Sequence, residues 1–286
     1  MREGEPRLIL QTDQAPSAGL LFTLLPGPAT RSHPALVGGS RQGFAQLSAA
    51  FELTQLVKLQ PKLIASAELA HALAALPSVA VLPVQSRELL SSSGWQALQD
   101  SDCVFIGLDM HLASSQQIIL SQVMRTLSTL MVCTDELAAM FRFEPELLRL
   151  STIIPFLRVE SLKRQALGLQ VPVRSTEARG VYGVADVLRS VDALGPLLIA
   201  YTDNHWYSYV RSEDCVVHSP LPAGSTVEEF IRIYWVALCL TVFARGQVAS
   251  LLERVQVAHY LTHQVLAQAN PLTSDQAHSL TRLLEG

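Results

Sequence analysis

The segment Pro222-Ala223-Gly224-Ser225-Thr226-Val227-Glu228-Glu229 leads into the apolar stretch from Phe230 to Ala244. Small residues in a turn that opens a buried helix leave backbone N–H groups unpaired at the positive end of the helix dipole. Such a place favours a bound anion. The same residues also fit a capping box, in which Thr226 caps the helix and Glu229 reaches back to the turn. Both interpretations predict a long buried helix after residue 226.

Segments typical of strands and helices alternate along the rest of the chain, which predicts a layered α/β protein. Strands are expected at 7–10, 20–25, 35–37, 62–65, 79–83, 102–107, 129–133, 151–155 and 196–201. Helices are expected at 42–59, 68–76, 114–127, 136–141, 159–168 and 184–193, and residues 91–94 are interpreted as a loop. A β-hairpin is predicted at 207–218, followed by helices at 227–244, 248–269 and 274–284.

This order predicts one doubly wound, mostly parallel sheet with helices on both faces. We expect a single domain over residues 1–286, with residues 1–19 loosely ordered and residues 270–286 forming a C-terminal helical extension. A chain of this length can bury one large core.

The composition excludes several classes of function. The formal charge of −4 gives no basic footprint for nucleic acid, and no run of Lys or Arg suits a membrane surface. The longest apolar run, 233–244, is far shorter than the roughly 20 residues that span a bilayer. Four isolated cysteines show no metal-binding spacing, and we expect the three that lie in apolar runs to be core residues of a cytoplasmic protein. Only 16% of the residues are charged, which favours a homo-oligomer with covered surfaces.

The order of the segments resembles the ribokinase-like fold. Over residues 20–269 it looks more specifically like the ADP- or ATP-dependent NAD(P)H-hydrate dehydratases, which are carbohydrate-kinase-like proteins. Ser32-His33-Pro34, followed by a strand that ends in Gly38-Gly39-Ser40, resembles the family's early His and Gly-Gly-Ser turn. The resemblance implies that Gly38, Gly39 and Ser40 line the substrate site. An ordinary strand-to-helix turn with Ser40 as N-cap is the alternative.

Two further segments resemble parts of the family's substrate pocket. Gly107 is the one residue that matches the family's Gly-Pro-Gly-Leu-Gly loop, and Asp109 and His111 beside it form either a new polar pair or a solvated loop. The segment 131–137 resembles Val-x-Asp-Ala-Asp-Ala-Leu, and it retains Asp135 at the end of a strand. Capping of the next helix by Thr134 and Asp135 is the alternative.

Three positions depart from the family at groups that carry its chemistry. In 153–160, which resembles Thr-Pro-His-x-x-Glu, Glu160 matches but Phe156 replaces the His. The strand that ends at Tyr201 lacks the family's Lys. Gly224-Ser225-Thr226-Val227 is matched to Gly-Ser-Gly-Asp, so Val227, which cannot titrate, stands where the resemblance implies the catalytic base. Glu228 follows it, about 100° further around the helix.

Other motifs add little. His259 and His263 lie one helical turn apart without an acid at useful spacing, and we expect a partly exposed helix face there. The apolar surface of the helix at 248–269 is wider than a surface helix needs, which predicts deep burial or a subunit interface.

Three hypotheses follow. The first is a non-catalytic relative of the dehydratases and carbohydrate kinases that retains nucleotide or dinucleotide binding, with ATP or ADP and Mg²⁺ as the implied cofactor and Gly224, Ser225 and Thr226 as the nucleotide contacts. The second is an active hydro-lyase or small-molecule kinase in which Glu228, Asp135 or Glu160 has taken a new role. The third is a structural protein that forms oligomers.

Overall fold

The structure is a computed structural model. It describes residues 7–12, 14, 16, 32–39, 44–66, 81–84, 92–110, 114–168, 180–191, 195–245, 249–268 and 273–285. The strand expected at 20–25, the helix expected at 68–76, Ser40 and His111 lie outside the described residues.

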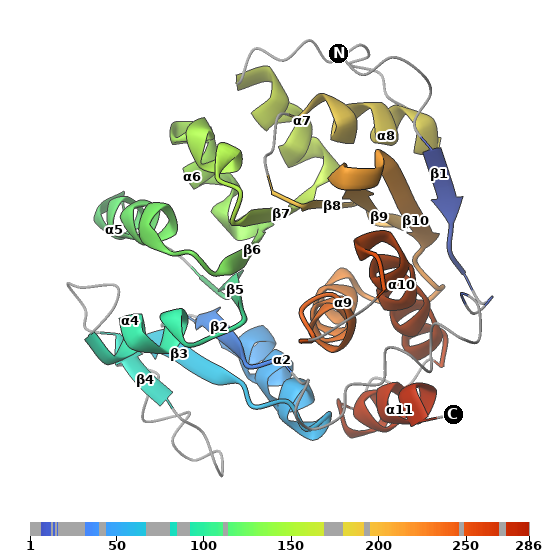
Figure 1. Cartoon of the computed structure of the whole chain (residues 1–286), viewed down its shortest axis with the longest axis horizontal. Coiled ribbons are helices and arrows are strands. Elements are labelled where there is room, and N and C mark those ends of the chain that lie inside the picture. Colours follow the sequence, from blue (N-terminus) through green and yellow to red (C-terminus); the bar gives the residue numbers. More distant parts are fainter. Residues whose placement is uncertain are drawn as a thin grey trace.

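One sheet runs through the described part of the chain, with ten strands in the order β1-β10-β9-β8-β7-β6-β5-β2-β3-β4 (Figure 1). The strands are β1 Arg7–Leu10, β2 Pro34–Gly38, β3 Lys62–Ser66, β4 Val81–Val84, β5 Cys103–Leu108, β6 Leu130–Thr134, β7 Ile153–Arg158, β8 Leu197–Tyr201, β9 His205–Val210 and β10 Cys215–Pro220. Strand β9 is antiparallel to β8 and β10, and the other neighbouring pairs are parallel. The predicted α/β architecture is confirmed.

Helices cover both faces of this sheet (Figure 1). One face carries α2 Ala45–Leu56, α9 Val227–Thr241, α10 Leu251–Ala267 and α11 Thr273–Glu285. The other face carries α4 Ser92–Gln99, α5 Ser114–Thr126, α6 Ala138–Phe143, α7 Val159–Gly168 and α8 Gly180–Ser190. The short 3₁₀ turns are η2 Asp135–Leu137, η3 Pro145–Arg149 and η4 Arg211–Glu213.

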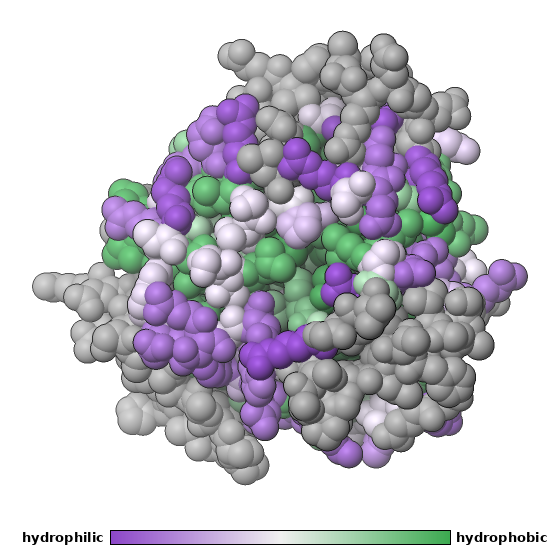
Figure 2. Space-filling model, viewed as in Figure 1, coloured by the Kyte–Doolittle hydropathy of each residue, from purple (hydrophilic) through white to green (hydrophobic). Residues whose placement is uncertain are grey.

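Alternation along the central strands divides the core into two layers. Phe105 and Val132 pack in the layer of α9, whereas Val104 and Met131 pack in the layer of α5 and α6. Because both faces are covered, the parallel strands read as continuous apolar runs in the sequence. On the face shown in Figure 2, hydrophobic residues are visible near the middle of the molecule, with hydrophilic residues above and below them.

Helix α9 forms the centre of its layer. Every residue from Arg232 to Thr241 is buried, and the Trp235 ring stacks on Phe105 with centroids 4.6 Å apart and planes at 8°. Helix α10 packs along α9, and the buried side of α10 includes Val255, Ala258 and Leu261. Burial against α9 and β10 therefore accounts for the wide apolar surface predicted for α10.

Three local predictions were wrong. The serines at 91–94 suggested a loop, but Ser92 begins α4, because burial of Leu98 and Ala97 against the sheet overrides the turn preference of serine. The helix expected from Glu136 begins as the 3₁₀ turn η2 before α6. His259, expected on a partly exposed face, is fully buried.

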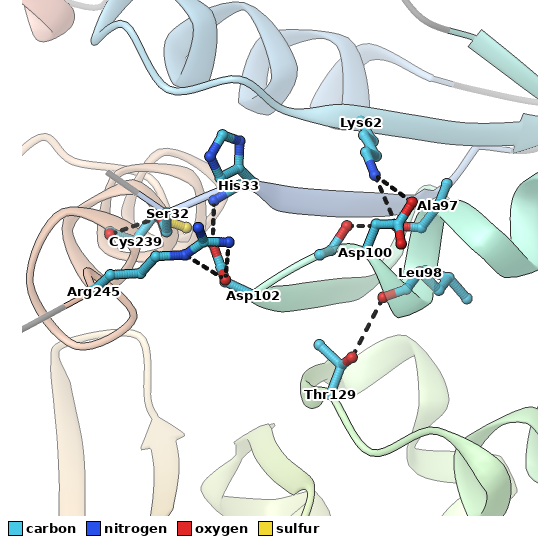
Figure 3. Close-up of polar contacts among 11 residues, drawn as sticks. Ser32, His33, Lys62, Ala97, Leu98, Asp100, Asp102, Thr129, Cys239 and Arg245 are labelled. Atoms are coloured by element: carbon cyan, nitrogen blue, oxygen red, sulfur yellow. Dashed lines mark hydrogen bonds and ion pairs between the residues drawn. The ribbon is translucent and has the colours of Figure 1, made fainter. Parts of the chain in front are cut away.

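Ion pairs and hydrogen bonds fasten the amino ends of β2 and β5 to the end of α9 (Figure 3). The Asp102 carboxylate accepts from the backbone N–H of His33 at 2.7 Å and from Arg245 at 2.7 and 2.9 Å. Ser32 donates to the carbonyl of Cys239, whose sulfur lies 4.0 Å from that of Cys103. All four cysteines are free and buried, whereas core positions were predicted for three of them.

A buried chain of polar side chains joins α9, α10, β9 and β10. The Ser219 hydroxyl donates to the carbonyl oxygen of Gln11, which can only accept, so Ser219 must accept from His259 Nδ1–H at 2.8 Å. His259 Nε2 is then the acceptor for the Ser208 hydroxyl at 3.0 Å, and Ser208 accepts from Tyr234 at 2.6 Å. Ser219 therefore fixes a proton on Nδ1, and the full burial of the ring favours the neutral imidazole over the imidazolium.

We expect the burial of a neutral His259 imidazole to make the free energy of unfolding fall at acid pH. Burial, with smaller contributions from His218 and His263, lowers the pKa of His259 well below its usual value. Below about pH 6.5 the unfolded state binds a proton that the folded state does not. The free energy of unfolding should then fall by up to about 1.4 kcal/mol per pH unit, and above pH 6.5 this contribution is constant.

Chemical denaturation between pH 5 and 8 checks this prediction. The His259→Gln variant should be less stable than the wild type at pH 8, and the difference should shrink as the pH falls. The His278→Gln variant alters an exposed histidine of α11 and should keep the wild-type slope. Equal slopes in the wild type and His259→Gln would refute the role of His259.

Candidate functional site

The carboxyl ends of the parallel strands are the place where α/β folds bind ligands, especially where the strand order reverses. Here the chain passes from β2 to β3 on one side and later returns to β5 on the other. The reversal point therefore lies between β2 and β5. Helix α9 begins just after β10 ends and runs back along the sheet, so its N-terminus lies at the same edge.

The glycines at the end of β2 bring its backbone against β5. A Cβ on Gly38 would lie 2.2 Å from the carbonyl oxygen of Leu108. Gly39 has φ of 79° and donates its N–H to the same oxygen at 2.8 Å. The close approach to Leu108 therefore accounts for glycine at both positions. The resemblance had assigned Gly38 and Gly39 to the substrate site.

Asp109, the residue after β5, closes the N-terminus of α2. Its carboxylate accepts from the backbone N–H groups of Gln46 at 2.8 Å and Leu47 at 3.1 Å. Asp109 adopts a left-handed backbone conformation with φ of 53°, which Asp tolerates better than most residues. The carboxylate therefore occupies the positive end of the α2 dipole, a role that the sequence did not reveal.

Gly107 and Glu136 close the loop after β5. Gly107 has φ of 108°, and a Cβ there would lie 2.2 Å from Thr134 Oγ1, which donates to the Gly107 carbonyl at 2.6 Å. The Glu136 carboxylate accepts from the N–H groups of Asp109 and Met110. Thr134 thus bonds to the neighbouring strand and does not cap the helix that follows.

Asp135 joins the ends of β6 and β7. Its carboxylate accepts from the backbone N–H of Arg158 at 2.9 Å. Glu160, two residues beyond Arg158, is exposed in the first turn of α7, where an acid complements the helix dipole. No hydrogen bond links Glu160 to the carboxylates of Asp135 or Glu228 in the described part of the chain. The structure therefore does not bring the three candidate acids into one hydrogen-bonded group.

Arg158 is a site residue that the sequence analysis missed. Its guanidinium lies 5.4 Å from the centre of the Tyr201 ring and donates to Asp203 at 2.9 Å. Burial is the main cause that raises the pKa of the Tyr201 hydroxyl, and the charges of Asp135 and Glu228 add to it. The one signal in the sequence is a cationic residue that ends a buried strand and directly precedes a helix.

Aromatic rings lie beneath this edge. Phe156, which stands where the resemblance implies a His, is fully buried and meets Tyr201, Phe230 and Tyr234 with centroids 5.6–6.0 Å apart. Trp206 is also fully buried, and its ring centre lies 5.0 Å from that of Phe230. Phe156, Phe230 and Trp206 offer contact area but no group that titrates.

The N-terminus of α9 carries the capping box. Thr226 Oγ1 accepts from the Glu229 N–H at 3.2 Å, and the Glu229 carboxylate accepts from the Thr226 N–H at 3.0 Å. Gly224 has φ of 89° with no heavy atom within 4 Å of a Cβ built there, and the Ser225 N–H donates to Pro222. Glu228 points into solvent, whereas Val227 packs against the core. The capping interpretation is therefore confirmed.

Comparisons in sequence find no relatives: no known family model and no curated protein matches the chain. Solved structures do match. A ribokinase-like superfamily protein of Enterococcus faecalis is 15% identical, with a TM-score of 0.67 over 97% of this chain and 95% of that one. The chain has the ribokinase-like fold.

Two other structures with this fold are similar in the same way. The ADP/ATP-dependent NAD(P)H-hydrate dehydratase of Bacillus subtilis, co-crystallised with ATP and Mg²⁺, is 14% identical, with a TM-score of 0.60 over 93% of this chain and 95% of that one. Adenosine kinase of Anopheles gambiae is 10% identical, with a TM-score of 0.51 over 99% and 96%. At these identities the likeness establishes the shared ribokinase-like fold alone.

Among the described residues, no group of three or more His, Cys, Asp or Glu side chains could hold a metal ion. No helix in this part of the chain has the length and apolar character needed to cross a membrane.

Replacing Asp109 should weaken this edge. We expect Asp109→Ala to lower the free energy of unfolding by about 1–2 kcal/mol, because two N–H groups of α2 lose their acceptor and alanine is strained at a positive φ. Asp109→Asn keeps an acceptor oxygen and tolerates this φ, so it should lose less. Urea unfolding of both variants measures the difference, and an unchanged Asp109→Ala would contradict the assigned role.

Proposed function

We propose that this protein is a non-catalytic member of the ribokinase-like fold, which performs neither phosphoryl transfer nor hydrate dehydration. The observation that carries the proposal is that the chain's own carboxylates occupy N–H groups which, in this fold, face the ligand edge. Asp109 fills the N-terminus of α2, Glu136 fills the loop after β5, and Glu229 fills part of the N-terminus of α9.

Electrostatics at the edge support the same conclusion. The Arg158 guanidinium already pairs with Asp203, and the charge of Asp135 also acts on it. Glu228 acts on the neighbouring Tyr201. A phosphate group entering beside Arg158 would meet these carboxylates and a guanidinium that is already paired, so its approach would be opposed by like charge. The exposure of Asp203 and Glu228 to solvent reduces this repulsion but does not change its sign.

The positions that would supply acid–base chemistry support it as well. Val227 packs against the core at the position matched to the catalytic Asp, and Phe156 lies in the aromatic cluster. Glu228, the neighbouring acid, is exposed and lies outside the capping box. General acid–base catalysis needs a titratable group within hydrogen-bond reach of the reacting atom.

The first test combines ligand binding and turnover. A relative in fold was crystallised with ATP and Mg²⁺, so ATP, ADP, NADH and NADPH with and without Mg²⁺ are the probes. We expect no conversion of hydrated NADH or NADPH, no phosphoryl transfer from ATP, and thermal shifts far below those of a ligand at 100 times its Kd. Such a ligand would stabilise the protein by about 2.7 kcal/mol.

Glu228→Gln separates the alternatives if any activity is found. Turnover in the wild type that is lost in Glu228→Gln would overturn the proposal and support a dehydratase with a displaced acid. A large ATP shift without turnover would instead retain the non-catalytic assignment and add nucleotide binding to it. Glu146→Gln is the matched control, because Glu146 is an exposed acid in the first turn of η3, which precedes β7 and lies away from the carboxyl ends of the strands.

A further inference from the structure

Arg232 on α9 is a buried cation whose hydrogen bonding is incomplete. Its exposure is 7%, and Nη2 donates to the side-chain oxygen of Gln276 on α11 at 3.1 Å. Its Nε–H is also buried and has no hydrogen-bond partner. A buried polar group without a partner requires an explanation, because leaving it unsatisfied is unfavourable.

Arg232 also differs from other arginines of the protein in its counter-ions. Arg158, Arg189 and Arg245 each meet a carboxylate at 2.7–2.9 Å. Among the described residues, Arg232 has no carboxylate within ion-pair distance, and Glu229 and Glu52 act on it only through longer-range attraction. Burial, the largest effect, lowers the pKa of Arg232. A guanidinium stays protonated under all ordinary conditions, so it remains a buried charge.

The position of Arg232 is near the ligand-binding edge of the fold. Helix α10 starts beside the C-terminal end of α9, where the Arg254 guanidinium donates to the carbonyl of Val242. Further along α10, His259 forms a hydrogen bond with Ser219, which lies near the carboxyl end of β10. It therefore runs toward the carboxyl edge, and α11 begins there with Gln276 in its first turns. Side chains on a helix lean toward its N-terminus, which directs Arg232 toward the same edge.

We propose that Arg232, together with Gln276 and the N-terminal end of α11, binds a small anion through a carboxylate or phosphate group. The unpartnered Nε–H supplies a charge-assisted donor, and the planar guanidinium suits the oxygens of either group. The positive end of the α11 dipole favours the same charge. This site is separate from the capped N-terminus of α9, and it does not depend on whether the protein is catalytic.

Calorimetric titration with sodium phosphate and with sodium acetate, in sodium chloride of constant ionic strength, tests the proposal. We expect saturable binding of at least one anion by the wild type, and the tighter of the two identifies the ligand group. Arg232→Met should raise the Kd by about tenfold or more, because it removes the donor while filling a similar volume. Arg232→Lys keeps the positive charge but loses the planar guanidinium, so its Kd should lie between those of the wild type and Arg232→Met.

Arg189→Met is the matched control, because it removes another mostly buried guanidinium, one that already pairs with Asp214, and it should leave the Kd unchanged. Thermal unfolding in chloride alone shows whether each variant folds. If Arg232 only fills space, Arg232→Met should be as stable as the wild type or more so, with unchanged anion affinity. That result overturns the proposal, as does the absence of saturable binding of either anion by the wild type.

Discussion

Burial of α9 on all sides is the constraint on which the rest of the structure depends. A helix with apolar residues around its whole circumference needs a partner on every side. The sheet provides one side through Phe105, and α2 and α10 provide the others. This enclosure fixes the N-terminus of α9 at the carboxyl edge of the sheet, beside the ends of β7 and β8. The candidate site is therefore a consequence of core packing.

The carboxyl edge of the sheet has the geometry of a ligand site in an open α/β fold, but side chains of the protein itself bond to its N–H groups. Strand ends, helix N-termini and a reversal of strand order meet there, as in other open α/β sheets. In this chain, however, Asp109, Glu136 and Glu229 form internal hydrogen bonds with the exposed N–H groups. Aromatic residues such as Phe156 occupy the layer below. These contacts make the carboxyl edge part of the stabilising framework of the protein.

Much of the fold was predictable because strand and helix periodicities persist over long buried segments. The hairpin of β9 and β10, the last three helices and the Thr226–Glu229 capping box all follow from local patterns. The partners of Asp109 and Arg158 could not be predicted, because their contacts lie 62 and 45 residues away in the sequence. Burial of His259 was missed for the same reason: Ser208 and Ser219 reach it from other elements.

The capping box at α9 has a consequence for competition at that position. The Glu229 carboxylate is held three residues from the N–H that it occupies, so it acts as a tethered ligand. Tethering over such a short span corresponds to an effective concentration of about millimolar or more. An anion from solution must exceed that concentration, or displace the carboxylate with much stronger contacts, before it can bind there. At low anion concentrations the Glu229 carboxylate therefore keeps the Thr226 N–H occupied.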